Sequence, residues 1–112
     1  MQTVIETESY LRAAKGAKMS EEEMTSAVDL VALDPEIGDV MQGTGGVRKV
    51  RLAGRGKGKS GGYRVVYFYG GGDIPVFLLT VFGKGEKANL TQGERNALRQ
   101  LTSTLKESQS ER

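Results

Sequence analysis

The stretch YRVVYFYGGGDIPVFLLTVF (residues 63–82) contains two runs of β-branched, aromatic and aliphatic residues separated by three glycines. This composition favours β-structure, and we expect strands over Tyr63–Tyr69 and Ile74–Phe82. The connection Gly70–Asp73 is short and glycine-rich, which is typical of a hairpin. Pro75 stands at the start of the second run, where a missing backbone N–H is tolerated. The stretch therefore predicts an antiparallel strand pair.

A third strand is expected just before this hairpin. Residues 47–52 alternate cationic with aliphatic side chains, as a half-buried strand does. They follow the glycine-rich turn Gly43–Gly46. Because the connections are of hairpin length, we expect the three strands to form an antiparallel meander. A first, short strand is expected at Thr3–Ile5, which is β-prone and flanked by polar residues.

A helix is expected to begin after Ser20, because Ser20 and Glu23 have the spacing of a capping box. It is expected to end at Asp34 and Pro35, since proline disfavours the α conformation in the residue before it. Its core face is expected to contain the apolar residues at helical spacing, namely Met24, Ala27, Val28, Leu30 and Val31.

Two further helices are expected, one on each side of this one in the sequence. The first is a short helix from Glu8 to about Ala14. The last begins at Thr91, with Glu94 three residues later as the partner in a capping box. Its core side chains are expected to be Leu98, Leu101 and Leu105.

The order β-α-α-β-β-β-α predicts an α+β domain with a small antiparallel sheet. A chain of 112 residues is long enough for one core, and we assign residues 1–107 to a single domain and residues 108–112 to a frayed C-terminal tail. The helices are expected to pack on one face of the sheet. The other face is expected to present Lys49, Arg51 and the cations of the following loop.

The composition restricts the chemistry that this chain can perform. Cysteine and histidine are both absent, so disulfides and a Cys/His zinc site are excluded. We expect no metal and no cofactor. No apolar run approaches the length of a membrane span, and the N-terminus lacks the basic and apolar regions of a signal peptide. We therefore expect a cytoplasmic protein.

Charge is distributed unevenly along the chain. Residues 1–42 contain three basic and nine acidic residues, whereas residues 43–72 contain seven basic residues and no acidic one. Such a basic segment is expected to bind a polyanion, most plausibly RNA or DNA phosphates. The alternative is that the cations of residues 54–59 form only a solvated hairpin tip.

A nucleotide-binding loop is the first alternative that this segment suggests. Residues 53–60, AGRGKGKS, match a loosened Walker pattern in which alanine replaces the first glycine. A phosphate-binding loop requires a helix N-terminus after it, but the residues that follow predict a strand. We therefore reject ATP or GTP hydrolysis.

Arg64 heads an otherwise apolar row, because strand alternation puts Arg64, Val66 and Phe68 on one face. It is either an edge residue that extends to solvent or a fixed guanidinium set to stabilise a phosphate. After the last strand, Phe82 could stack on a base while Lys84 and Lys87 contact phosphate. The alternative for Phe82 is a core aromatic at a strand end.

The segments GTGGVRKVRL, RGKGKSGGYRVVYFY, FLLTVFGKGEKANLT and ERNALRQL, in this order, resemble the RelE/HigB-like toxins of bacterial type II toxin–antitoxin modules. The resemblance is strongest from about Ile37 to Leu101. It implies a microbial RNase-like fold, the RelE fold. It also implies a ribosome-dependent mRNA endoribonuclease in which a ribose 2′-OH attacks the adjacent phosphate without a metal.

The resemblance, carried over by position, implies one set of site residues, and the basic segment with the strand pattern predicts a second set. Those matching the family's functional cations, which we expect to be catalytic, are Arg64, Lys57, Lys59 and Lys84. Those expected to bind RNA are Lys49, Arg51, Arg55, Phe82 and Lys87. Arg64 is the residue we expect to stabilise the transition state.

The chain departs from its relatives in the groups that transfer protons. Some relatives use a histidine and a tyrosine near the C-terminal end, but this chain has no histidine and no tyrosine after Tyr69. Phe82 stands where a relative has tyrosine. The general base for the 2′-OH is therefore unassigned, with a lysine of lowered pKa or Glu86 as the remaining choices.

The resemblance also implies partners: mRNA in the ribosomal A site, a cognate helix-turn-helix antitoxin, and operator DNA bound only through that antitoxin. Two rival functions keep the same fold. One is a toxin that inhibits DNA gyrase, and the other is a non-catalytic RNA-binding module that lacks proton-transfer groups.

Overall fold

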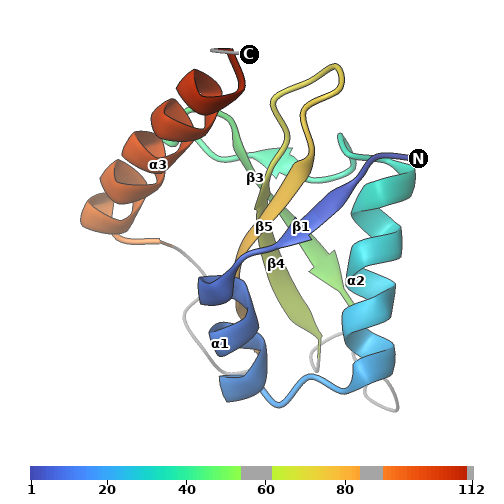
Figure 1. Ribbon diagram of the computed structural model, residues 1–112. Helices are drawn as coiled ribbons and strands as arrows, with labels where there is room; N and C mark the ends of the chain where they lie inside the picture. The colour runs from blue at the N-terminus through green and yellow to red at the C-terminus, as the bar shows by residue number, and fades with distance from the viewer. Residues whose placement is uncertain (54–61, 84–89, 111–112) are drawn as a thin grey trace.

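A five-stranded sheet, in the order β1-β5-β4-β3-β2, runs through the middle of the structure (Figure 1). The structure is a computed structural model that describes residues 1–53, 62–83 and 90–110. The strands are β1 (Val4–Glu6), β2 (Asp39–Val40), β3 (Val47–Leu52), β4 (Tyr63–Phe68) and β5 (Val76–Phe82). The helices are α1 (Glu8–Gly16), α2 (Glu21–Leu33) and α3 (Gln92–Ser110). None of these helices, over the ranges described, is long and apolar enough to cross a membrane.

The antiparallel pairing of β3, β4 and β5 is confirmed, but the sheet as a whole is mixed. β1 runs parallel to β5, with Val4 opposite Val76. The expectation of a purely antiparallel meander is therefore wrong. A parallel pair needs a long crossover, and here α1, α2 and the other three strands lie between the two partners. The short strand β2, which pairs antiparallel with β3, was also not expected.

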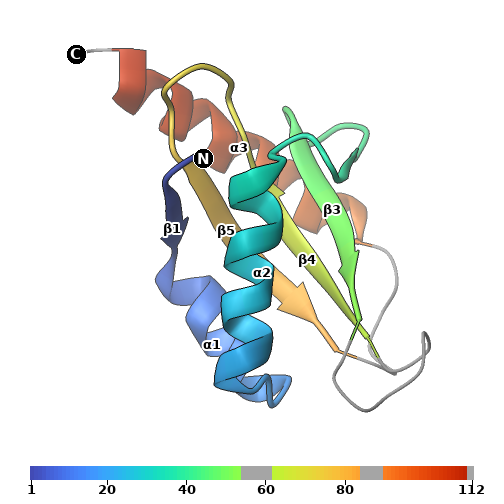
Figure 2. The same ribbon diagram turned by 90° about the vertical axis from the view of Figure 1, so that its right-hand side faces the viewer.

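The expectation that all helices pack on one face is also wrong (Figure 2). α1 and α2 cover the face that carries Tyr67 and Leu78. α3 covers part of the opposite face, where Leu98 and Leu105 pack against a cluster that includes Phe68. Nearly every side chain of β4 and β5 is buried, so both faces of these strands are apolar and each needs a cover.

The expected helix starts are confirmed. Ser20 and Glu23 form a reciprocal capping box at α2, with N···O distances of 2.8 and 3.1 Å. Thr91 and Glu94 make the same pair of bonds at α3, at 2.8 and 3.1 Å. Both helices therefore begin where local hydrogen bonding satisfies their first free N–H groups.

α3 is fixed at one end of its sheet face by the turn between β2 and β3. The Thr102 hydroxyl donates to the carbonyl of buried Thr44 at 3.2 Å, and the Arg95 guanidinium donates to the Gln42 carbonyl at 2.7 Å. Gly45 approaches so closely that a Cβ there would lie 2.4 Å from Thr102 Oγ1. These contacts hold α3 over the start of β3.

The sequence pattern assigned the wrong residue to the centre of this contact. Leu101 was expected in the core but is 40% exposed, whereas Thr102 is buried. Leu98, Thr102 and Leu105 follow the i, i+4, i+7 spacing of one helix face. Thr102 can take the inner position because its single hydroxyl proton has a carbonyl acceptor there, that of Thr44 or that of Arg99.

Candidate nucleic-acid interface

Arg51, Arg64 and Phe82 form a row across three neighbouring strands. Arg51 is the cross-strand partner of Arg64, and Arg64 is the partner of Phe82. Direct partners have Cβ atoms about 5 Å apart on the same face. The row therefore sets two guanidinium side chains and one aromatic ring beside each other.

A second row lies next to the first on the same face. It contains Lys49, Val66 and Thr80, which are also register partners. Val66 is buried, whereas Lys49 and Thr80 are half-buried. We refer to the accessible members of the two rows, Lys49, Arg51, Arg64, Thr80 and Phe82, as the sheet patch.

A β-bulge decides which residue stands beside Arg64. Tyr67 pairs with Leu78, but Val66 pairs with Thr80, so Leu79 is an extra residue in β5. Without the bulge, regular pairing would put Val81 opposite Arg64. The extra residue instead brings Phe82 to that position.

The sheet patch is positively charged because it contains Lys49, Arg51 and Arg64. Arg51 and Arg64 face each other directly across β3 and β4. Within the described ranges, the Arg51 and Arg64 side chains form no ion pair and no side-chain hydrogen bond. Directly opposed like charges are destabilising, and a bound anion would relieve their repulsion. Asp39 is the cross-strand partner of Lys49 on β2, so the Arg51–Arg64 pair is the most positive part of the patch.

The start of β4 is anchored from the other face of the sheet. The Tyr63 hydroxyl donates to Glu23 Oε1 at 2.9 Å, and Glu23 is itself almost fully buried. Burial, with the hydrogen bond and charge of Glu23, raises the pKa of Tyr63. Gly62 lies so close to β3 that a Cβ there would be 2.5 Å from the Leu52 carbonyl oxygen. Arg64 therefore projects from a strand whose first residue is held firmly.

Arg48 belongs to the same basic segment but not to the sheet patch. It lies on the opposite face as the partner of Tyr67. Its guanidinium donates to the carbonyls of Gly38 at 2.8 Å and Glu36 at 3.2 Å, and lies 3.9 Å from the Glu36 carboxylate. Tyr67 completes this corner by donating to the Pro35 carbonyl at 2.8 Å. Arg48 is therefore a structural residue that fastens the chain before β2.

Five of the sequence-predicted site residues lie outside the described residues: Arg55, Lys57, Lys59, Lys84 and Lys87. Residues 54–61 lie between β3 and β4 in the sequence, and residues 84–89 follow β5. The strand residues nearest to these segments, Leu52, Tyr63 and Phe82, lie at the same end of the sheet as Arg64. Thr80 was not predicted as part of the site. Strand alternation from Phe82 could have identified it, because Thr80 lies two residues earlier in β5 and therefore on the same face.

Among the described residues, no group of three or more carboxylate, histidine or cysteine side chains is arranged to hold a metal ion. What the sheet patch offers is a pair of permanent cations beside an aromatic ring. Guanidinium groups bind phosphate oxygens in a bidentate manner, and an aromatic face stacks on nucleobases. The geometry suits one nucleotide step of a single-stranded nucleic acid.

Comparisons with known proteins point in the same direction. A family model described as "RelE toxin of RelE / RelB toxin-antitoxin system" matches residues 2–112. The solved structure of the E. coli toxin RelE, an arginine double mutant in the free state, is 26% identical with a TM-score of 0.52. The match covers 78% of this chain and 86% of that chain.

Proposed function

Because this chain belongs to the RelE toxin family, we propose that it is a ribosome-dependent endoribonuclease that cleaves mRNA and so inhibits translation. The observation that carries the proposal is the row of Arg51, Arg64 and Phe82 across β3, β4 and β5. It supplies two adjacent cations for one phosphate and a ring for the neighbouring base. The family also implies an antitoxin partner.

In the proposed reaction the ribose 2′-oxygen attacks the adjacent phosphorus, and the bond from phosphorus to the 5′-oxygen breaks. The products are a 2′,3′-cyclic phosphate and a free 5′-hydroxyl, with no net change in atoms or charge. The 2′-OH proton leaves to a base, and a proton is delivered to the departing 5′-oxygen. Negative charge builds up on the phosphate oxygens between these steps, and a fixed guanidinium stabilises it. We assign this role to Arg64.

The remaining residues receive supporting roles. Arg51 and Lys49 draw the RNA backbone onto the sheet, and Phe82 stacks on a base. The residues that we propose to act from the neighbouring segments are Lys57, Lys59 and Lys84 on the phosphate, and Arg55 and Lys87 on the RNA backbone. Proton transfer is worth about 10²–10⁴ in rate, so an enzyme that relied on charge alone would be slow.

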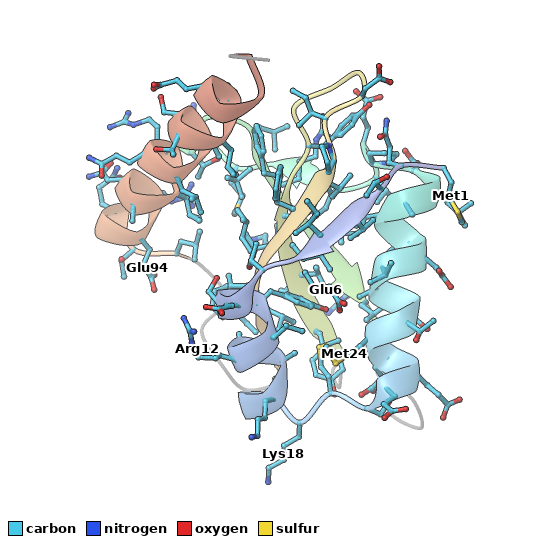
Figure 3. The ribbon with its side chains drawn as sticks, in the orientation of Figure 1. Met1, Glu6, Arg12, Lys18, Met24 and Glu94 are labelled. Atoms are coloured by element: carbon cyan, nitrogen blue, oxygen red, sulfur yellow. The ribbon has the colours of Figure 1, made fainter. Side chains whose placement is uncertain are left out.

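The direct test is cleavage of a defined mRNA on purified, translating ribosomes, mapped by primer extension. We expect Arg64→Ala to slow cleavage by about 10²–10³-fold, as the loss of one transition-state donor does. Arg12→Ala is the matched control, because Arg12 projects from α1 away from the sheet (Figure 3). The control is expected to cleave like the parent.

Other outcomes would change the assignment. If Arg64→Ala cleaves as fast as the parent, Arg64 is not catalytic. If the parent binds RNA in a salt-sensitive manner but never cleaves it, the non-catalytic RNA-binding function is correct instead. Growth arrest with intact mRNA and accumulating DNA breaks would identify a gyrase inhibitor.

We propose a helix-turn-helix protein as the antitoxin, with operator DNA bound only through it, and the cytoplasm as the site of action. The support is the resemblance of residues 37–101 to the RelE/HigB-like toxins, since the antitoxin in the HigB branch of that group is typically a helix-turn-helix protein. Co-expression with the protein encoded by the adjacent open reading frame tests this proposal. Restored growth and a co-purifying helix-turn-helix partner are expected, and a partner of another fold would contradict it.

A further inference from the structure

Thr80 is the only polar residue of β5, which reads VFLLTVF from Val76 to Phe82. Its register partner is the buried Val66 of β4, so its side chain lies on the same face of the sheet as Arg64 and Phe82. Thr80 itself is half-buried. A single hydroxyl thus lies among the apolar side chains of this part of the sheet patch.

The fold does not account for this hydroxyl. It forms no hydrogen bond with any residue that the structure describes. The other two hydroxyls on β4 and β5, those of Tyr63 and Tyr67, both donate hydrogen bonds within the fold. Valine has the same branched shape as threonine and a similar preference for strands, so it would serve the sheet equally well. The Thr80 hydroxyl is therefore available to a ligand.

The pairing of β4 with β5 places Thr80 diagonally opposite Arg64. Phe82 is the direct partner of Arg64, and Thr80 stands two residues before Phe82. Diagonal neighbours on one face of an antiparallel pair have Cβ atoms roughly 7 Å apart, which is within reach of a long side chain. Arg64, Phe82 and Thr80 thus form a triangle with a cation, an aromatic ring and a hydroxyl at its corners.

These three groups match the three parts of a nucleotide. The guanidinium of Arg64 suits the phosphate, and the ring of Phe82 suits the base. The ribose joins the phosphate to the base, so it lies beside the third corner of the triangle, Thr80. A threonine hydroxyl both donates and accepts hydrogen bonds, as does the ribose 2′-OH, which is the group that lets a protein tell RNA from DNA.

We propose that the Thr80 hydroxyl forms a hydrogen bond with the 2′-OH of the ribose bound between Arg64 and Phe82, and that this contact selects RNA over DNA. The placement of the nucleotide rests on the proposed function. The phosphate and base contacts of the sheet patch serve both nucleic acids alike, so they do not supply this selection. Thr80 supplies it by binding the sugar.

The probes are an oligouridylate and an oligodeoxyuridylate of equal length, which differ only in their 2′-OH groups. Fluorescence anisotropy at one salt concentration gives the affinity of the purified protein for each. We expect the parent to bind the RNA more tightly. Thr80→Val is expected to lower the ratio of RNA affinity to DNA affinity by about 3–10-fold, as the loss of one hydrogen bond does. Its affinity for the DNA is expected to be unchanged.

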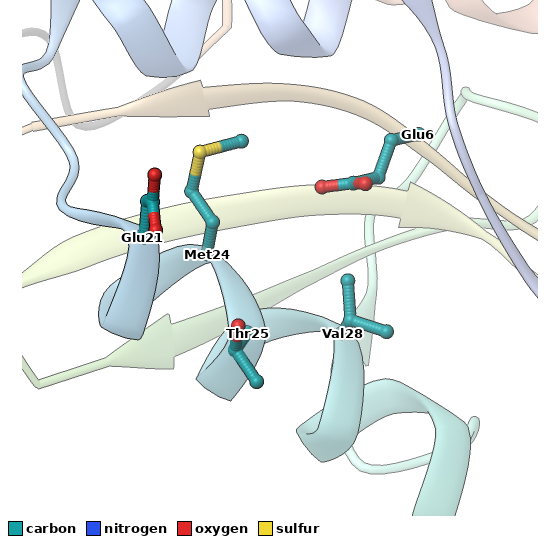
Figure 4. A pocket seen from close by; sticks show the side chains of 5 residues that line it. All are labelled: Glu6, Glu21, Met24, Thr25 and Val28. Carbon is teal, nitrogen blue, oxygen red and sulfur yellow. The ribbon is translucent and has the colours of Figure 1, made fainter.

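Two further variants serve as controls. Thr80→Ser keeps the hydroxyl and is expected to retain the parental ratio. Thr25→Val makes the same exchange on α2, which covers the opposite face of the sheet. Thr25 also has no hydrogen bond to a described residue, and it lines a pocket beside Met24 and Val28 (Figure 4). Thr25→Val is expected to leave both affinities unchanged. Urea unfolding checks that each variant is folded, which we expect because threonine and valine have the same shape.

Several results would overturn the proposal. An unchanged ratio in Thr80→Val would exclude the sugar contact. An equal loss of RNA and DNA affinity would mean that Thr80 acts only through the shape of the sheet. A parent that binds DNA as tightly as RNA, or binds neither, would also overturn it. The slope of log K against log salt for the RNA is expected to be the same in the parent and in Thr80→Val, because no phosphate contact is removed. A lower slope in the variant would contradict this.

The binding assay is independent of cleavage, so it separates this inference from the proposed function. If the ratio falls in Thr80→Val but the parent leaves mRNA intact on translating ribosomes, the sugar contact is correct and the nuclease activity is not. If the parent cleaves mRNA and the ratio is unchanged in Thr80→Val, the nuclease activity is correct and the sugar contact is not.

Discussion

The Tyr63 hydroxyl donates a hydrogen bond of 2.9 Å to the Glu23 carboxylate and thereby joins the start of β4 to the first turn of α2. The same carboxylate oxygen accepts from Ser20 N at 2.8 Å, as the capping box requires. The buried Glu23 carboxylate thus takes part in the N-terminal cap of α2 and also anchors the strand that carries Arg64. This contact therefore links α2, which covers one face of the sheet, to β4, which contributes Arg64 to the sheet patch on the other face.

Two conservative substitutions should therefore have opposite effects on the free energy of unfolding. Tyr63→Phe removes a donor from buried Glu23, so we expect a loss of about 1.5–3 kcal/mol. Tyr10→Phe removes a buried hydroxyl that has no partner in the described ranges, so we expect unchanged or higher stability, by up to about 1–3 kcal/mol. Urea unfolding measures both. Equal losses in the two variants would contradict this account.

Alkaline pH should weaken the fold. The folded-state pKa of Tyr10 is raised to about 12, above its usual value of 10.0, and that of Tyr63 is also raised, in both cases mainly by burial. The unfolded chain therefore loses these protons first. Stability is complete below about pH 10 and falls above it, by up to about 1.4 kcal/mol per pH unit for each group.

Urea unfolding at several values between about pH 9 and pH 12 measures this slope. Tyr10→Phe provides the control, because it removes one of the titrating groups. Its stability is expected to decline less steeply with pH than that of the parent. A parent stability that rises through this range would refute the assignment of these tyrosines as buried and neutral.

Replacing Gly45 with alanine should weaken the contact between α3 and the turn before β3 and so lower the free energy of unfolding. Gly45 has φ +78°, and a Cβ there would lie 2.4 Å from Thr102 Oγ1. Gly43 has nearly the same φ, +77°, but open space around its Cβ position. Gly43→Ala therefore reports the backbone cost alone, about 1 kcal/mol. Gly45→Ala is expected to lose about 1–2 kcal/mol more in urea unfolding, since Thr102 must also move. Identical losses would mean that the contact is easily relaxed.

Relieving the charge repulsion in the sheet patch should increase the free energy of unfolding and weaken RNA binding. Arg51→Gln removes one of two opposed cations, so we expect a gain of about 0.2–1 kcal/mol in unfolding free energy. Binding to single-stranded RNA is expected to weaken, and the slope of log K against log salt to fall by about 0.7. Fluorescence anisotropy at several salt concentrations measures this, with Arg12→Gln as the control. An unchanged salt slope would exclude Arg51 from the RNA contact.

Local patterns predicted the local structure well. The capping boxes at Ser20 and Thr91 involve residues three apart, and their hydrogen bonds formed as expected. The pairing of β4 with β5 follows from two apolar runs joined by a glycine-rich turn. These features depend on neighbours in the sequence, so the sequence contains nearly all the information needed to predict them.

Features that depend on distant partners could not be predicted in this way. Nothing within residues 4–6 indicates that their partner is β5 or that the pairing is parallel. The choice of Thr102 over Leu101 at the α3 contact depends on the Thr44 carbonyl, which only the folded chain brings near. The two apolar faces of β4 and β5, by contrast, are visible in the sequence and do imply a cover on both sides of the sheet.

The candidate site also combines a feature that local pattern predicts with one that it does not. Strand alternation was enough to put Arg64 on the same face as Val66. It could not predict that Phe82 stands opposite Arg64, because that depends on the single extra residue at Leu79. Bulges have no strong sequence signature here, since β5 contains no glycine.

The parallel pairing of β1 with β5 has a consequence for the order in which the chain folds. The N-terminal strand is made first, but its partner Val76 is separated from Val4 by most of the chain. Closing so long a loop costs entropy before any contact rewards it, and the five-stranded sheet is complete only once β5 has been made. A chain interrupted before β5 lacks the strand that joins β1 to β4. Such a fragment cannot bring Arg64 and Phe82 together, so we expect that an unfinished molecule is harmless to the cell that makes it.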